Sequence, residues 1–466
     1  MRNAVSEDTT DRVRITRRSV RHAVVDHKMV VFLIAILGLA LRLGVKLTGV
    51  TGAVGYTFYW GLAQNILSGN GLCTDATSLG WFVIGGEPVD ILGRVCAHIT
   101  PGYPLFLALS LLGGTGLLWW VIPQAVISIG TVIGGYLIGK LLFDRLTGVL
   151  ASLFVALYPY YVWHDTALQD TSIHVFLITT SVVLLLQAKR SHSLIISGLA
   201  GVTLGVGILV KGTLVPFTII AVLWLLVFGA PVLRIRVRKA ATVGVISILV
   251  LSPWVLRNWV LLGAPVLTTQ GGLYFWQANH DTSFLCFPEQ DMDCSLPQAW
   301  SSLSATDKAE LQQLAGNEVA QDSWFARKGA EYVWNHPVQT VERAIRKVMI
   351  AFSWKFYPYV EANYGQETAN AKTPLALAVY TVSYVPMLIL GLIGMVRARR
   401  SWRDHILIYA MFLMFVGATV IFKGYVSYRS HLDVQLMVFA ASVLRFSVTS
   451  SGIRSLPVWA GKQGPS

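Results

Sequence analysis

The sequence predicts an all-α protein that crosses a membrane many times. Only 13% of its 466 residues are charged, against roughly 25% in an ordinary soluble domain. Hydrophobic residues make up 54% of the chain, and the mean hydropathy is +0.58. They occur in blocks of about 20, the length that a helix needs to cross the hydrocarbon core of a bilayer. Basic residues gather in the connectors between these blocks, so we predict a polytopic membrane protein.

Ten blocks fit membrane-spanning helices. They lie near residues 29–48, 117–139, 147–163, 171–188, 193–210, 213–230, 240–258, 376–396, 405–422 and 432–448. The apolar stretch 101–116 is shorter and is interrupted by Gly113 and Gly114, so we expect a helix at the outer membrane interface there. The first block follows a polar, basic tail and is long enough to remain as a signal anchor.

The Lys and Arg residues orient these spans. In a ten-span topology, five basic groups fall on the side that the positive-inside rule assigns to the cytoplasm. The groups are Arg12, Arg14, Arg17, Arg18 and Arg21; Lys140 and Arg145; Lys189 and Arg190; Arg234, Arg236, Arg238 and Lys239; and Arg397, Arg399, Arg400 and Arg403. The net charge of +13 therefore reflects topology and not nucleic-acid binding. We expect a plasma (inner) membrane protein with both termini in the cytoplasm.

This topology divides the chain into five parts and places two large loops outside the cytoplasm. The parts are a basic tail (1–28), an N-terminal transmembrane module (29–258), an extracytoplasmic helical loop (259–375), C-terminal transmembrane helices (376–448) and a second tail (449–466). The first outer loop, residues 48–119, lies within the N-terminal module. The second is too long for a simple connector, and a helix is expected to begin at Pro337, because proline is tolerated in a first turn.

All four cysteines fall in the two outer loops. Cys73 and Cys96 lie in the first loop, and Cys286 and Cys294 lie in the second. An oxidising compartment would permit one disulfide within each loop. Four free thiols are the other interpretation, since none of the spacings is diagnostic.

Ionisable residues gather at the expected outer ends of the spans. Such residues cost about 2.5–3.5 kcal/mol each at the centre of a membrane helix, so they are usually paired or functional. His164, Asp165 and Asp170 lie between the third and fourth spans. Four cations lie at such ends: Lys211 between the fifth and sixth spans, Arg257 at the end of the seventh, and Lys423 and Arg429 between the ninth and tenth. Singly, each could be an interfacial cap; together they predict a basic pocket for a lipid-linked phosphate, beside carboxylates that could serve as a base.

Five stretches occur in a characteristic order: YWGLAQNILSGNGL (59–72), PGYPLFLALSLL (101–112), YPYYVWHDTALQD (158–170), PWVLRNWVLLGAPVLTTQGGLYFWQAN (253–279) and SYRSHLDVQLMVFAA (427–441). Together they resemble the bacterial family-39-like GT-C glycosyltransferases, membrane enzymes related to protein O-mannosyltransferases and to the lipid A aminoarabinose transferase. The resemblance implies a GT-C-like bundle, juxtamembrane helices in the first outer loop and a polyprenyl-phosphate sugar as donor. It also implies a catalytic carboxylate in that loop.

One position departs from the family pattern. The first-loop acid expected four positions before Tyr59 is Gly55 in this chain. Asp75 or Asp90 of the same loop could replace it, or the chemistry could pass to Asp165 and Asp170. Alternatively, the chain has lost transferase activity and binds a lipid or a partner.

We therefore predict a glycosyltransferase that moves a hexosyl or pentosyl unit to an extracytoplasmic lipid, glycan or protein. Its general base, which typically contributes about 10²–10⁴-fold, is assigned to Asp170, with Asp165 or Asp75 as further candidates. The donor phosphate is assigned to the four cations above. On the acceptor or sugar side the candidates are His164, Asn279, Tyr59 and Tyr103.

No close-spaced metal-ligand motif is present, so we require no cofactor, although several carboxylates leave room for a divalent cation. The main alternative is an inactive lipid-binding or scaffold protein of the same fold. A transporter or flippase is less favoured, because the ionisable residues lie at span ends and the sequence shows no repeated halves.

Overall fold

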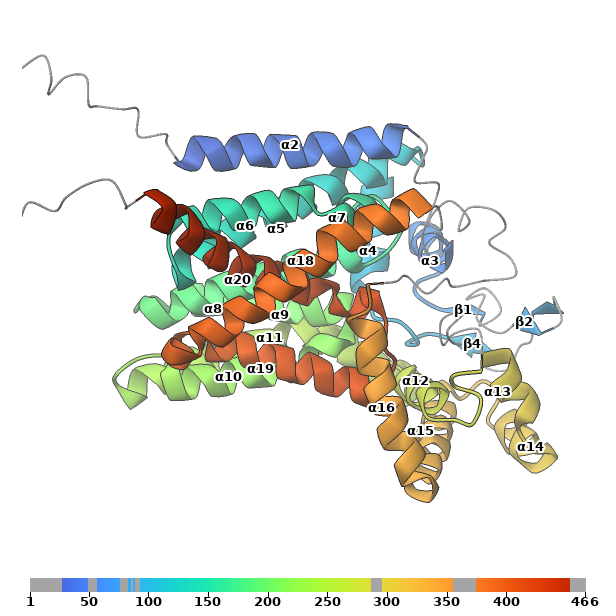
Figure 1. Ribbon diagram of the computed structural model, residues 1–466. Coiled ribbons are helices and arrows are strands. Elements are labelled where there is room, and N and C mark those ends of the chain that lie inside the picture. The colour runs from blue at the N-terminus through green and yellow to red at the C-terminus, as the bar shows by residue number, and fades with distance from the viewer. Residues whose placement is uncertain are drawn as a thin grey trace, which may run out of the picture.

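The computed structural model describes residues 27–48, 57–75, 83–84, 87–88, 93–285, 296–354 and 374–452. Long helices lie side by side in one bundle, and shorter helices and strands gather at one end of it (Figure 1). The prediction of an all-α polytopic membrane protein is confirmed.

Each of the ten predicted spans is helical. The bundle contains α2 (His27–Leu47), α5 (Leu117–Leu142), α6 (Arg145–Leu157), α7 (Pro159–His164), α8 (Thr171–Arg190), α9 (Leu194–Val210), α10 (Val215–Phe228), α11 (Leu233–Leu262), α18 (Pro374–Ala398), α19 (Trp402–Ile421) and α20 (Val426–Gly452). The predicted third span consists of α6 and α7, because Pro159 lacks an N–H group and begins a new helix.

Five segments are long and apolar enough by themselves to cross a membrane. They are His27–Leu47, Leu117–Leu142, Thr171–Arg190, Leu233–Leu262 and Leu377–Ile421, the last of which joins α18 to α19 through the short turn η4 (Arg399–Ser401). Helices α6, α9 and α10 are apolar but shorter. α4 (Gly102–Leu111) has ten residues, about 15 Å of helix, so it is too short to cross the bilayer, as expected for residues 101–116.

The two loops form a cap of short elements at one end of the bundle. The first loop contributes α3 (Thr57–Leu67), α4 and the strands β1 (Thr74–Asp75), β2 (Val83–Ile84), β3 (Glu87–Pro88) and β4 (Arg94–Val95). β1 pairs antiparallel with β4, and β2 with β3. The second loop contributes α12 (Gly271–Ala278), α13 (Leu296–Ser302), α14 (Ala305–Gln313), α15 (Glu318–Asn335) and α16 (Pro337–Ala351).

Helix α16 begins at Pro337, as predicted, and lies across the end of the bundle, at a steep angle to the long helices (Figure 1). One of its faces is buried and includes Lys347 and Ile350, whereas Val341 and Ile345 are exposed on another. The buried face places a lysine inside the cap.

Close packing within the bundle depends on small residues, as is usual where membrane helices meet. α5 and α6 approach so closely that a Cβ on Gly139 would lie 2.7 Å from the Cα of Gly148. A Cβ on Gly44 of α2, by contrast, would meet nothing within 4 Å.

Gly139→Ala is therefore expected to destabilise the bundle, because backbone atoms must move to admit the methyl group, at a cost of about 1–3 kcal/mol. Gly44→Ala, the control, should be neutral or stabilising, since alanine is the better helix former by about 1 kcal/mol. Thermal unfolding of the two purified variants in detergent measures the difference. Equal melting temperatures would contradict the close contact.

Candidate functional site

Asp170 and Lys211 form an ion pair at the end of the bundle that carries the outer loops. Asp170 precedes the first turn of α8, and Lys211 lies in extended conformation between α9 and the short turn η2 (Gly212–Leu214). The Lys211 Nζ lies 3.2 Å from Oδ2 and 3.4 Å from Oδ1 of Asp170. The lysine side chain is 20% exposed and the aspartate side chain 9% exposed. Two predicted site residues therefore meet at a partly open position.

Asp165 belongs to a different and more deeply buried pair. Its Oδ2 accepts a hydrogen bond of 2.8 Å from Nε of Arg42, and the two side chains are 5% and 0% exposed. The Arg42 guanidinium also donates to the backbone oxygens of Gly38 and Ala156. Arg42 was not among the predicted site residues, although a charge inside the first apolar span was a usable signal. In this position Asp165 holds α2 against the turn before α8.

The Arg429 guanidinium is likewise buried and makes hydrogen bonds to other protein groups. It binds Asp433 at 2.9 and 3.3 Å and donates to the Ala351 oxygen and the Tyr380 hydroxyl. The Tyr158 hydroxyl donates to the same aspartate at 3.0 Å. Arg429 therefore joins α16, α18 and α20, and its side chain is only 1% exposed.

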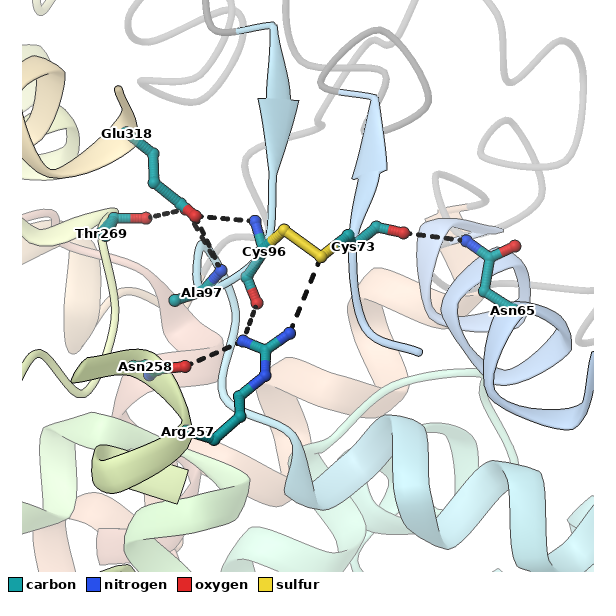
Figure 2. Close-up of a disulfide and its surroundings, with 8 residues drawn as sticks. All are labelled: Asn65, Cys73, Cys96, Ala97, Arg257, Asn258, Thr269 and Glu318. Carbon is teal, nitrogen blue, oxygen red and sulfur yellow. Dashed lines mark hydrogen bonds between the residues drawn. A yellow bond between two sulfur atoms is a disulfide. The ribbon is translucent and has the colours of Figure 1, made fainter. Parts of the chain in front are cut away.

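Arg257, the predicted phosphate ligand in α11, contacts the first outer loop (Figure 2). Its Nη1 donates to the Cys96 oxygen and to Asn258 Oδ1, each at 2.8 Å, and Nη2 lies 3.7 Å from the sulfur of Cys73. Cys73 and Cys96 form a disulfide. This arginine therefore holds the disulfide-closed loop on the bundle.

Glu318, at the first turn of α15, fixes the same loop from the other side (Figure 2). Its carboxylate accepts hydrogen bonds from the backbone N–H groups of Cys96 and Ala97 and from the Thr269 hydroxyl, the last at 2.6 Å. Glu318 thus ties the second loop to the first. Glu318 was not among the predicted site residues.

Tyr59 and Tyr103 lie beneath the turn that carries the carboxylates. The two rings meet edge-on with centroids 4.7 Å apart. The Tyr103 hydroxyl donates to Gln124 Oε1 at 2.9 Å, and Gln124 Nε2 donates to the backbone oxygens of Asp165 and Ala167. Both predicted tyrosines are therefore buried and support the turn between α7 and α8.

A line of cations and aromatic rings leads away from Lys211. Its Nζ lies 5.4 Å from the Tyr428 ring centre, and the Tyr428 ring meets Tyr425 edge-on at 5.2 Å. Lys423 Nζ lies 6.0 Å from the Tyr425 ring and 4.1 Å from the Tyr274 ring. Lys211 and Lys423, two of the four predicted cations, are thus connected through the start of α20.

The Asn279 side chain makes three hydrogen bonds to protein groups. Its Nδ2 donates to the backbone oxygens of Phe275 and Ile421, and its Oδ1 accepts from Lys347 Nζ at 3.0 Å. Lys347 also donates to the Val420 oxygen at 3.1 Å. Burial, with the charge of Arg343 nearby, lowers the pKa of Lys347 to about 7. Asn279 therefore links α12, α16 and α19.

The remaining predicted residues lie at the edges of this region. His164 is half-buried, its ring lies tilted against Tyr160 with centroids 4.0 Å apart, and it shares a hydrogen bond with the Gln169 amide. Asp75 is exposed in β1, opposite Arg94. Outside the described residues lie Gly55, Asp90, Cys286 and Cys294. Within the described ranges, no group of three or more His, Cys, Asp or Glu residues could hold a metal ion.

Comparison with known proteins agrees with this architecture. Residues 98–256 match the family model of dolichyl-phosphate-mannose-protein mannosyltransferases. This match covers well under half of the chain but includes Asp165, Asp170 and Lys211. A search of curated proteins found no match.

Solved structures show the fold over nearly the whole chain. The archaeal oligosaccharyltransferase AglB from Archaeoglobus fulgidus, in complex with an inhibitory peptide and a dolichol-phosphate, superposes with a TM-score of 0.54 at 13% identity, covering 93% of this chain and 52% of that one. An apo oligosaccharyltransferase from the same organism gives 0.54 at 14% identity, covering 94% and 53%. The present chain thus spans about half the length of these proteins. Its resemblance to GT-C membrane glycosyltransferases is confirmed.

The buried Arg42–Asp165 pair predicts a non-additive mutational effect. Arg42→Met or Asp165→Asn alone leaves a charge buried without its partner, which costs about 3–5 kcal/mol of unfolding free energy. The double variant removes both charges and should lose clearly less than the sum. Denaturation of the four proteins in detergent completes the cycle. Strictly additive losses would contradict the pair.

The neutral form of Lys347 predicts a pH-dependent stability. Between pH 7 and 10.5 the unfolded chain holds the proton that the folded protein has released, so this residue makes stability rise with pH in that window. Below pH 7 both states are protonated, and the folded protein carries the full cost of the buried charge. The melting temperature, measured from pH 6.5 to 9.5, should therefore rise less steeply with pH in Lys347→Met than in the wild type. An unaltered pH profile would contradict a neutral amine.

Proposed function

We propose that this protein is an integral-membrane glycosyltransferase that moves a sugar from a polyprenyl-phosphate donor to an extracytoplasmic acceptor. The GT-C-like fold and the partial match to the mannosyltransferase family support a transferase. A dolichol-phosphate is bound in one of the matching structures, which supports a lipid-linked donor of this class. Membrane lipid surrounds the bundle, and the acceptor class, whether lipid, glycan or protein, stays open.

One observation supports placing the site at the Asp170–Lys211 pair. Three carboxylate–cation pairs are described above. The arginine side chains of Arg42–Asp165 and Arg429–Asp433 are at most 1% exposed, whereas the Lys211 side chain in the Asp170–Lys211 pair is 20% exposed. A ligand can reach this pair without dismantling the bundle. Lys211 offers a point charge suited to a phosphate, and the carboxylate beside it offers a base.

In the proposed reaction the donor phosphate replaces Asp170 as the partner of Lys211. When its ammonium binds the donor phosphate, the Asp170 carboxylate loses its cation and can accept the proton of the acceptor hydroxyl. The acceptor oxygen then bonds to the anomeric carbon, and the bond from that carbon to the phosphate oxygen breaks. The electron pair passes to the lipid phosphate, whose added negative charge Lys211 stabilises.

The other predicted residues receive supporting roles in this proposal. Asp165 orients the turn before α8, because Arg42 already holds its carboxylate. Arg257 and Arg429 shape the surroundings through their protein contacts. Lys423 adds positive potential along the aromatic line. Asp75 and a divalent cation are not required, and a chelator should leave turnover unchanged.

The proposed orientation places the loops outside the cytoplasm of a plasma (inner) membrane protein. The Cys73–Cys96 disulfide lies in the first of these loops, and disulfides persist in oxidising compartments. Lys140, Lys189 and the other connector cations lie at the opposite ends of their helices, consistent with the positive-inside rule. These observations support both termini in the cytoplasm and the division of the chain into five parts.

The test is sugar transfer or release from a panel of polyprenyl-phosphate hexoses and pentoses by purified protein. Asp170→Asn should lower turnover about 10²–10⁴-fold, and Lys211→Met should raise KM for the donor and lower turnover. Lys189→Met is the matched control: Lys189 pairs with Asp404 at the same distance of 3.2 Å, near the other end of α8. That variant should retain wild-type turnover.

Full turnover by Asp170→Asn would exclude this base. Wild-type protein that binds these donors without turning any over would instead support an inactive lipid-binding protein, the alternative suggested by Gly55.

A further inference from the structure

Two imidazoles lie inside the bundle next to the Asp170–Lys211 pair. His174 lies in α8, one helical turn after Asp170, and its backbone N–H donates to the backbone oxygen of Asp170 at 2.9 Å. His431 comes from α20, three residues after Tyr428, whose ring faces Lys211. The two imidazole rings meet edge-on with centroids 5.5 Å apart. Three chain segments that are distant in sequence therefore bring two histidines and a lysine together.

These imidazoles are buried, and most of their nitrogens have no hydrogen-bond partner. His174 is 2% exposed and His431 is 3% exposed. Both ring nitrogens of His174 and Nε2 of His431 make no hydrogen bond among the residues that the structure describes. Leaving a buried polar group unpaired costs about 1–3 kcal/mol, and native proteins contain few such groups. Two such imidazoles in ring contact, beside a lysine, offer hydrogen-bond donors to a ligand.

Charge indicates the class of that ligand. The Lys211 ammonium interacts electrostatically with both imidazoles. Whichever tautomer is present, each imidazole has at least one N–H donor. Two N–H donors and an ammonium group from three segments match an oxyanion, which accepts several hydrogen bonds at once. The Arg429 guanidinium also acts on His431, and Asp433 pairs with that guanidinium at 2.9 Å.

We propose that His174 and His431 bind the phosphate of the prenyl-linked substrate together with Lys211. This inference rests on the proposed function and deepens it: Lys211 supplies the charge, and the histidines supply N–H donors from inside the bundle. A phosphate held on its inner side by α8 and α20 keeps the sugar beside Asp170. The site then distinguishes a prenyl phosphate from a prenyl alcohol.

The test measures binding of farnesyl phosphate to the full-length protein in detergent, with farnesol as the phosphate-free probe and inorganic phosphate as the lipid-free probe. Wild type should prefer farnesyl phosphate over farnesol. His174→Leu and His431→Leu should each weaken farnesyl phosphate binding roughly 10- to 100-fold, the effect expected for one hydrogen bond to a charged group. Farnesol binding should not change. His174→Gln and His431→Gln keep an N–H donor and should recover most of the loss.

Stability separates a binding role from a structural one. The leucine variants remove unpaired polar atoms, so their melting temperatures should equal or exceed that of the wild type. Variants that melt earlier and bind farnesyl phosphate normally would overturn the proposal. Competition by inorganic phosphate would show that the phosphate alone is recognised, and its absence would show that the prenyl chain is needed as well.

Two failures are distinguishable. If wild type and Lys211→Met bind farnesyl phosphate and farnesol equally, the donor class is wrong and both proposals fail. If Lys211→Met weakens the binding of farnesyl phosphate but neither leucine variant does, the histidine inference alone fails.

Discussion

The pairing of charges at one end of the bundle is the constraint on which the rest of this structure depends. A charge taken out of water is costly unless a partner of opposite sign is close. Arg42 meets Asp165, Lys211 meets Asp170, and Arg429 meets Asp433. The first two pairs join chain segments that are far apart in sequence, and they fix the turn between α7 and α8. This turn carries the candidate base, so the requirement for neutrality also positions the chemistry.

The outer loops are held to this end of the bundle by polar contacts of the same kind. Glu318 binds the backbone next to the Cys73–Cys96 disulfide, and Arg257 binds it from α11 (Figure 2). Lys347 contacts both α12 and the end of α19. The loops are therefore parts of one polar framework above the bundle. Arg257, Asn279, Cys73 and Cys96, all predicted site residues, belong to this framework, so their side chains are already occupied.

A fold shared with oligosaccharyltransferases does not by itself define the reaction, because one fold can support several activities. The present chain spans about half the length of those proteins, and it has Gly55 where the resemblance leads one to expect an acid. The candidate site is local: an aspartate–lysine pair whose lysine is partly exposed, next to two histidines with three ring nitrogens that make no hydrogen bond within the described residues. The functional proposal depends on this arrangement more than on the fold.

The sequence alone determined the helical segments, because the bilayer requires long apolar helices whose backbone groups bond within each segment. It also indicated that ionisable residues gather at one end, and it included Asp170 and Lys211 among the candidates. It could not assign partners. Asp165 and Asp170 are five residues apart and both are buried, yet the first is bound by a fully buried arginine and the second by a lysine whose side chain is 20% exposed. Arg42 was a charge in an apolar span and His431 lies in the stretch 427–441, but no pattern named a partner for these two residues or for Glu318, Lys347 or His174. Their roles arise from which helices pack together, a property that periodicity along one chain does not contain.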